Sequence, residues 1–122
     1  MRPNLPPERA GVHWVALATT AFSPFVPFFA NASAAHPAWE RAGERPEGDS
    51  AYWLLRTLGM LAESRYALAR KPVDDFLAAC RQKAHAFVVA TDASSAGLSG
   101  EELTAALTEA NRAFMDSRYG FM

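Results

Sequence analysis

The only thiol of the sequence, Cys80, is the first side chain to test for chemistry, because a cysteine beside a histidine is a common nucleophile. His85 is the nearest imidazole along the chain. Five residues on a helix turn a side chain through about 140 degrees, so Cys80 and His85 point away from one another. Cys80 also falls among apolar positions, where a free cysteine usually behaves as a small hydrophobic residue. We therefore predict a core role for Cys80.

The histidines and acidic residues show no arrangement that would hold a metal ion. His13, His36 and His85 lack the spacing of a ligand pair, and the sequence has neither a CxxC pair nor a Cys/His cluster. Adjacent carboxylates at Asp74 and Asp75 diverge by about 100 degrees on a helix and suit a first helical turn, where the dipole favours negative charge. The sequence predicts no metal site.

The elements that position these side chains belong to one domain or a part of one, over residues 1–122. Half of the residues are hydrophobic and 20% are charged, which is typical of a globular chain with a core. The net charge is -1 and no basic stripe occurs, so we expect no nucleic-acid partner. A single cysteine cannot form an internal disulfide and fits a reducing compartment, so we expect a cytoplasmic location.

Four segments are expected: a proline-rich lead-in at 1–11, an apolar strand and extended path at 12–30, a polar loop at 31–48, and three helices at 49–119. Together they predict an α+β fold that is mainly α, with one or two apolar strands followed by three packed helices.

The apolar segment 12–30 contains no Asp, Glu, Lys or Arg and admits three interpretations. A membrane helix conflicts with Pro24 and Pro27 inside it, so we expect no membrane partner. A secretory signal within residues 1–32 would make the protein secreted. We favour a buried strand at 13–18 with an extended edge path after it, where proline is tolerated because it cannot donate to a ladder.

Helix signals are clearer in the second half of the chain. Asp49 or Ser50 is expected to cap the first helix, and Pro72 to end it and start the second. A capping box formed by Ser99 and Glu102 starts the third helix, and a glycine at position 120 suits its end. The side chains expected to be mostly buried are Leu54, Leu58, Leu61, Phe76, Cys80, Phe87, Leu107 and Phe114.

A lone apolar strand cannot satisfy its own backbone hydrogen bonds, so the front of the chain is expected to need a sheet supplied from elsewhere. The expected partner is a second copy of the chain, giving a homodimer, or a missing portion of a larger fold.

Aromatic residues form two dense groups on either side of the polar loop, and core packing is one explanation for them. The order of residues is the other. Val12-His13-Trp14-Val15-Ala16-Leu17, Phe22-Ser23-Pro24-Phe25-Val26-Pro27-Phe28-Phe29 and Asp49-Ser50-Ala51-Tyr52-Trp53-Leu54-Leu55-Arg56 together resemble the C-terminal region of the dipeptidase A family. That family comprises cysteine dipeptidases of the N-terminal-nucleophile hydrolase superfamily. The matching positions, which we expect to be structural, are Trp14, Ser23, Pro24, Phe25, Pro27, Ser50, Tyr52 and Trp53.

The resemblance implies the C-terminal part of an αββα fold and a peptide-bond hydrolase that uses no metal or organic cofactor. In such enzymes the nucleophile is an N-terminal cysteine whose own amino group acts as the base. This chain begins Met1-Arg2-Pro3, so no catalytic residue carries over. We expect a fragment or subunit that needs an N-terminal dipeptidase portion and is inactive alone. The alternative is a non-catalytic interaction module that self-associates.

Overall fold

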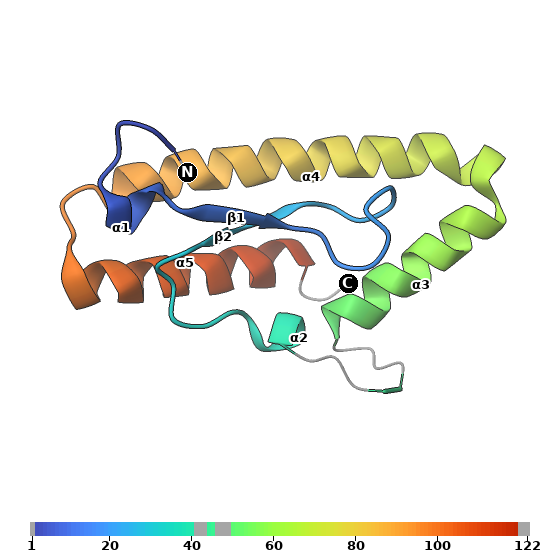
Figure 1. Cartoon of the computed structure of the whole chain (residues 1–122). Coiled ribbons are helices and arrows are strands. Elements are labelled where there is room, and N and C mark those ends of the chain that lie inside the picture. The colour runs from blue at the N-terminus through green and yellow to red at the C-terminus, as the bar shows by residue number, and fades with distance from the viewer. Residues whose placement is uncertain (1, 41–43, 46–49, 120–122) are drawn as a thin grey trace.

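A hairpin of two strands packed on long helices forms the fold, which confirms the α+β, mainly α class (Figure 1). The computed structural model describes residues 2–40, 44–45 and 50–119. Its elements, in chain order, are α1 (Pro7–Ala10), β1 (Val12–Val15), β2 (Val26–Phe29), α2 (Pro37–Glu40), α3 (Ala51–Ser64), α4 (Tyr66–Ser94) and α5 (Gly100–Tyr119).

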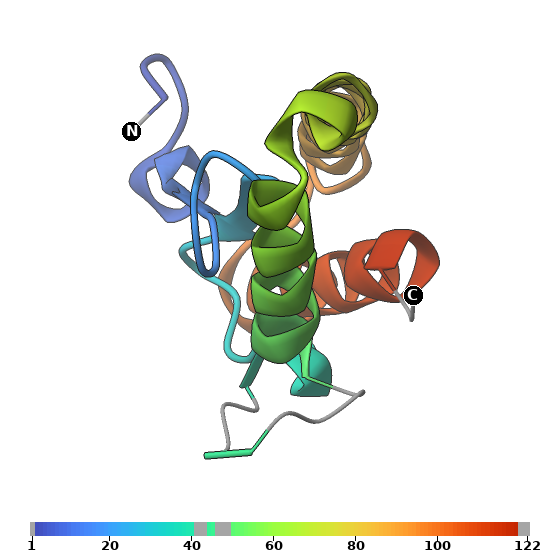
Figure 2. The same ribbon diagram turned by 90° about the vertical axis from the view of Figure 1, so that its right-hand side faces the viewer.

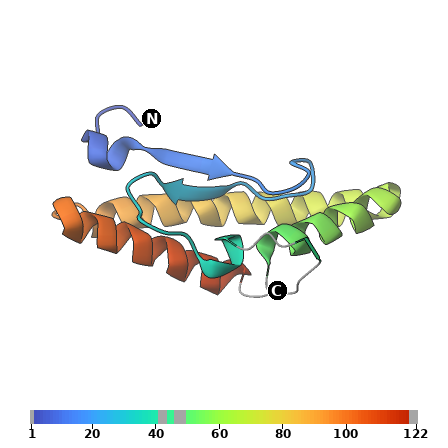
Figure 3. The same ribbon diagram turned by 60° about the horizontal axis from the view of Figure 1, so that its bottom comes forward.

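The long helices and the hairpin form two layers. Figure 3 shows the strands lying over α4 and α5, with β2 next to the helices and β1 on the outside. Figure 2, which looks along α4, shows α3 running transverse to it at one end. The hairpin is therefore covered by helices on one side only within the described part of the chain.

The apolar segment at the front of the chain forms an antiparallel hairpin, in which Val12 lies opposite Phe29 and Val15 opposite Val26. The first strand is shorter than the expected 13–18. The expectation of one or two strands is confirmed, because the extended path after β1 turns back and pairs with it. A sheet completed from elsewhere stays a prediction. Among the described helices, none is long and apolar enough to cross a membrane.

The free edge of β2 is satisfied by one buried side chain of α5. Asn111, which is 1% exposed, donates from Nδ2 to the carbonyl of Pro27 (2.8 Å) and accepts at Oδ1 from the backbone N–H of Phe29 (3.1 Å). Pro27 has no N–H, and its position in the strand points that missing group away from β1, so the ladder loses nothing. Asn111 thus replaces part of a further strand.

The core consists of two clusters that form between β2 and the two helices facing it, α4 and α5. The first contains Val26, Ala84, Phe114 and Met115, and the second contains Phe29, Val88, Leu103 and Leu107. Phe87 of α4 packs against both: its ring stacks on Phe114 with centroids 4.3 Å apart and meets Phe29 edge-on at 5.9 Å. This one aromatic side chain therefore connects the two clusters.

The expected burial is correct where the helices face β2 and wrong elsewhere. Leu107 and Phe114 are buried, and four others of the expected set are half-buried: Leu54, Leu58, Cys80 and Phe87. Leu61 is 63% exposed and Phe76 is 36% exposed, so their predicted burial is wrong. Neither residue belongs to the two core clusters formed with β2.

The boundary between the first two long helices is also displaced from its predicted position. The break lies at Arg65, and Pro72 lies inside α4. A proline in the second turn of a helix removes only the N–H bond to the carbonyl of Leu68, which α4 tolerates over its 29 residues. Ser50 occupies the N-cap position of α3, but its side chain makes no capping hydrogen bond. Positions 49 and 120, also expected to act as caps, lie outside the described residues.

The N-terminal lead-in is tied to the end of α4. Its short helix α1 carries Arg9, whose guanidinium donates to the carbonyls of Asp92 (2.7 Å) and Ala96 (3.1 Å) and to Oγ of Ser95 (2.9 Å). Arg2 forms an ion pair with the Asp92 carboxylate. A cation at the C-terminal end of a helix binds its unpaired carbonyls and complements its dipole, so these contacts stabilise α4.

Replacing Asn111 by Ala should lower the free energy of unfolding by about 2–4 kcal/mol, because it leaves two buried backbone groups of β2 without partners. Urea denaturation followed by circular dichroism measures this. Glu109→Ala, an exposed change on the same helix, is the matched control and should stay within about 0.5 kcal/mol of the unchanged protein. A loss for Asn111→Ala as small as the control would show that β2 does not depend on this side chain.

Candidate functional site

The connection between β1 and β2, residues 16–25, lies between α3 and α4 and is fixed at several points. It turns where the N–H of Phe22 donates to the carbonyl of Thr19 (3.0 Å). The Phe22 ring meets Tyr66 of α4 edge-on at 6.3 Å, and a Cβ added to Gly59 of α3 would lie 3.9 Å from the nearest atom of this ring. Ala18 adopts a left-handed backbone with φ of 61°, which is unfavourable for a residue with a side chain.

A hollow of about 290 Å³ opens between this connection and α4. From the hairpin and its connection it is lined by Trp14, Thr20, Ser23, Pro24 and Phe25, and from α4 by Leu77, Arg81 and His85. Arg81 and His85 are four residues apart, so both project from the same face of α4. Polar side chains of two elements, far apart in the sequence, therefore converge on one concave surface.

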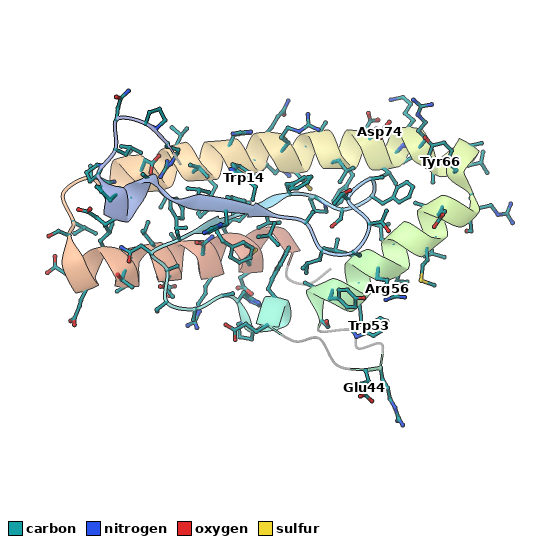
Figure 4. The ribbon with its side chains drawn as sticks, viewed as in Figure 1. Trp14, Glu44, Trp53, Arg56, Tyr66 and Asp74 are labelled. Atoms are coloured by element: carbon teal, nitrogen blue, oxygen red, sulfur yellow. The ribbon has the colours of Figure 1, made fainter. Side chains whose placement is uncertain are left out.

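The aromatic wall of the hollow is held by a contact across the two elements. The Trp14 ring lies 5.0 Å from the His85 imidazole, centroid to centroid, at an interplanar angle of 41°. Figure 4 shows Trp14 reaching from β1 alongside α4. It remains 38% exposed, which is high for a tryptophan in the middle of a fold.

The polar groups of the hollow include one that is buried without a partner. Ser23 is 2% exposed, and its Oγ has no hydrogen-bond partner among the residues that the structure describes. Within the same part of the chain, the Arg81 guanidinium has no acidic partner. A buried hydroxyl without a hydrogen bond is uncommon in folded proteins, and it marks the hollow as a place to look for a ligand.

A second arginine lies on the other side of the connection. Arg56 of α3 donates to the hydroxyl of Tyr52 (2.6 Å), and its guanidinium lies 5.9 Å from the Tyr52 ring centroid and 5.5 Å from that of Trp53. Figure 4 shows Trp53 and Arg56 together near the start of α3. A smaller hollow of about 240 Å³, lined in part by Tyr52, Arg56, Ala18 and Thr19, separates them from the connection. Arg56 is thus already engaged by aromatic rings.

The structure therefore divides the eight family-signature positions into three groups. Trp14, Ser23, Pro24 and Phe25 come together at the larger hollow, while Pro27 is buried in β2 beside α5. The remaining three lie at the start of α3: Ser50, Tyr52 and Trp53.

Sequence analysis missed Arg81 and tested His85 only as a partner for a thiol and as a metal ligand. The signal that could have found them was their spacing of four residues on one helix face, but only the fold shows that this face meets the connection.

Cys80 and His36 are not among the residues that line the larger hollow. Cys80 is half-buried and packs against the core cluster of Val26 and Phe114. His36 lies 3.5 Å through Nε2 from the carboxylate of Asp116. Over the described residues, no group of three or more His, Cys, Asp or Glu side chains could hold a metal ion.

One surface lysine of α4, Lys71, has a raised pKa. A hydrogen bond from the Lys71 ammonium to Asp75 (2.9 Å), together with the charge of that carboxylate, raises the pKa of Lys71 above its ordinary value of 10.5. Both side chains are largely exposed, so the ion pair is screened by solvent and contributes little to stability.

Comparison with known proteins assigns this α+β chain to a class of peptidases. Residues 1–78 match the family model described as Peptidase family C69. The chain belongs to peptidase family C69.

Curated relatives agree with this assignment and are longer. The chain is 31% identical over 116 residues to a protein named probable dipeptidase A from Streptococcus pyogenes serotype M18 (strain MGAS8232), covering 95% of this chain and 24% of the relative. It is 33% identical over 92 residues to a probable dipeptidase from Latilactobacillus sakei, covering 75% and 20%. Dipeptidase A from Lactobacillus helveticus is 28% identical over 119 residues, covering 98% and 25%. The chain therefore spans at most a quarter of the length of these relatives.

Replacing Ser23 by Ala should leave the free energy of unfolding unchanged or raise it by about 1 kcal/mol, because the change removes a buried hydroxyl that has no partner. Ser95→Ala is the matched control: Ser95 is equally buried, but its Oγ donates to the Thr91 carbonyl (2.7 Å) and accepts from Arg9. That control should lose about 1 kcal/mol. Thermal or urea unfolding compares the two. A loss at Ser23 equal to that at Ser95 would show that the Ser23 hydroxyl is already hydrogen-bonded.

Proposed function

We propose that this chain is the C-terminal portion of a dipeptidase, a peptide-bond hydrolase of the N-terminal-nucleophile type, and that it is inactive without the remainder. The observation that carries the proposal is the extent of the similarity. Almost the whole chain aligns with the Lactobacillus helveticus dipeptidase A, yet it accounts for 25% of that relative. A portion of this size supplies structure and part of a binding surface, while the nucleophile comes from elsewhere.

The position of Cys80 supports the absence of a nucleophile. A reactive thiol needs an accessible, electropositive surrounding that favours the thiolate. Cys80 instead packs half-buried against the core, and it does not line the larger hollow. His85, the nearest imidazole in the sequence, faces Trp14. Neither residue is placed as the nucleophile of a peptidase.

The surface of the chain supports a missing partner. Apolar side chains are exposed on α3 and α4, among them Met60, Leu61 and Leu68. In the described part of the chain β1 pairs with β2 alone, so its outer edge can accept a further strand. We propose that the remainder of the dipeptidase covers these surfaces and continues the sheet beyond β1.

The test is dipeptide hydrolysis by a chimera, in which this chain replaces the segment of the Lactobacillus helveticus dipeptidase A that aligns with it. We expect the chimera to hydrolyse dipeptides, and both the chain alone and the relative with that segment deleted to be inactive. Cys80→Ala in the chimera should leave the rate within about twofold, since the side chain belongs to the core. Hydrolysis by the isolated chain that disappears in Cys80→Ala would overturn the proposal.

A second candidate, a non-catalytic module that self-associates, is favoured by the same exposed apolar residues. Light scattering of the isolated chain at micromolar concentration distinguishes the two candidates, in combination with the chimera. A homodimer together with an inactive chimera would favour the module. A homodimer that dissociates when the remainder of a dipeptidase is added would show that the second copy only occupies the surface for that partner.

A cytoplasmic location belongs to this proposal, because a sequence with one cysteine forms no internal disulfide and suits a reducing compartment. Fractionation of the producing cells should recover the protein in the cytosol, and recovery from the medium would contradict this part of the proposal.

A further inference from the structure

We propose that the hollow between the β1–β2 connection and α4 binds the carboxylate of a small molecule that carries an apolar side chain, namely the C-terminal residue of a short peptide. The carboxylate follows from the side chains of the hollow. The choice of a peptide as its source rests on the proposed function.

The positive charge in the lining of the hollow favours the binding of an anion. Arg81 is the charged residue of its lining, His85 stands one turn away on the same helix, and no Asp or Glu is among the described residues that line it. A guanidinium presents donors in a planar fork that matches a carboxylate. One arginine beside neutral hydroxyl groups suits a single negative charge better than the double charge of a phosphate.

The hydroxyl groups of the hollow favour a ligand that carries hydrogen-bond acceptors. Ser23 lines the hollow, and its buried Oγ has no hydrogen-bond partner among the described residues; Thr20 adds a second hydroxyl-bearing residue to the lining. A buried donor gains most from a ligand that offers an oxygen, because water does not reach it freely. A carboxylate has two such oxygens, enough to accept from Ser23 and from Arg81 at once.

The rest of the wall selects an apolar group beside the carboxylate. Trp14 is 38% exposed, Phe25 is 50% exposed, and both border the hollow together with Pro24 and Leu77. The volume of about 290 Å³ lies at the lower end of small-molecule sites, so it admits one amino-acid residue and part of a second. Contact with an apolar side chain would cover the aromatic surface that the free protein leaves exposed.

The probe is N-acetyl-L-leucine, which carries the carboxylate and side chain of a peptide C-terminus, added to the full chain and followed by ¹H–¹⁵N NMR. We expect saturable shifts at the Trp14 indole and at the amides of Thr20, Ser23 and His85, with a dissociation constant of about 1–10 mM. N-acetyl-L-leucinamide, which lacks the charge, should bind at least about tenfold more weakly. Inorganic phosphate that shifts the same signals at equal concentration would show a general anion site and overturn the peptide assignment.

Variants test the named side chains. Arg81→Gln should weaken N-acetyl-L-leucine binding about 5–10-fold, and Ser23→Ala about 2–5-fold. Lys83→Gln removes one positive charge two residues away on α4, outside this hollow, and should change the affinity less than twofold. Equal weakening by Arg81→Gln and Lys83→Gln would reduce the effect to overall charge and overturn the site. Unchanged binding in both Arg81→Gln and Ser23→Ala would do the same.

These measurements separate this inference from the proposed function, because binding to the chain requires no hydrolysis. An inactive chimera with intact N-acetyl-L-leucine binding would remove the dipeptidase role and leave the carboxylate site. An active chimera whose chain shows no binding would remove the site and leave the role.

Discussion

The amide of Asn111 fixes the position of the hairpin, and most of the molecule depends on that position. By donating to one backbone group of β2 and accepting from another, it treats the strand edge as a neighbouring strand would. With β2 held on α5, Val26 belongs to one core cluster and Phe29 to the other, and Phe87 of α4 packs against both clusters. The connection that leads from β1 into β2 then runs between α3 and α4, where it forms one wall of the larger hollow. A single polar side chain in the core thus determines where a surface site can exist.

Sequence reasoning succeeded where a signal is local and failed where it depends on tertiary contacts. The proline at position 27 was correctly expected on an edge, since its missing N–H is a local property. Pro72 was expected to end a helix, and it lies inside α4, because the loss of one hydrogen bond near a helix start is small compared with a helix of this length. Apolar periodicity predicted Leu61 and Phe76 as buried, but periodicity does not reveal which turns of a helix meet the core clusters.

The candidate site illustrates the same limit. Trp14, Ser23, Pro24 and Phe25 were recognised from the order of residues in the chain, and they do meet at one hollow. Arg81, which brings the charge, and His85 lie more than fifty residues further on, and no spacing in the sequence links them to residues 16–25. At the hollow a buried hydroxyl has no hydrogen-bond partner among the described residues, and two aromatic side chains are more exposed than they would be in a core. Such local costs are typical of surfaces shaped for binding rather than for stability.

Contacts between residues far apart in the sequence also bear on when each element can fold. The partners of Asn111 lie 82 and 84 residues before it, and Arg2 lies 90 residues before Asp92. During synthesis the hairpin therefore emerges long before the helix that completes its edge, and it must wait with its apolar residues uncovered. Closing so long a loop has an entropic cost that contacts with α5 offset, and contacts of such large sequence separation slow folding relative to local ones. Until α5 is complete, the apolar side chains of the hairpin lack the helix that covers them, and exposed apolar strands of this kind are prone to aggregation.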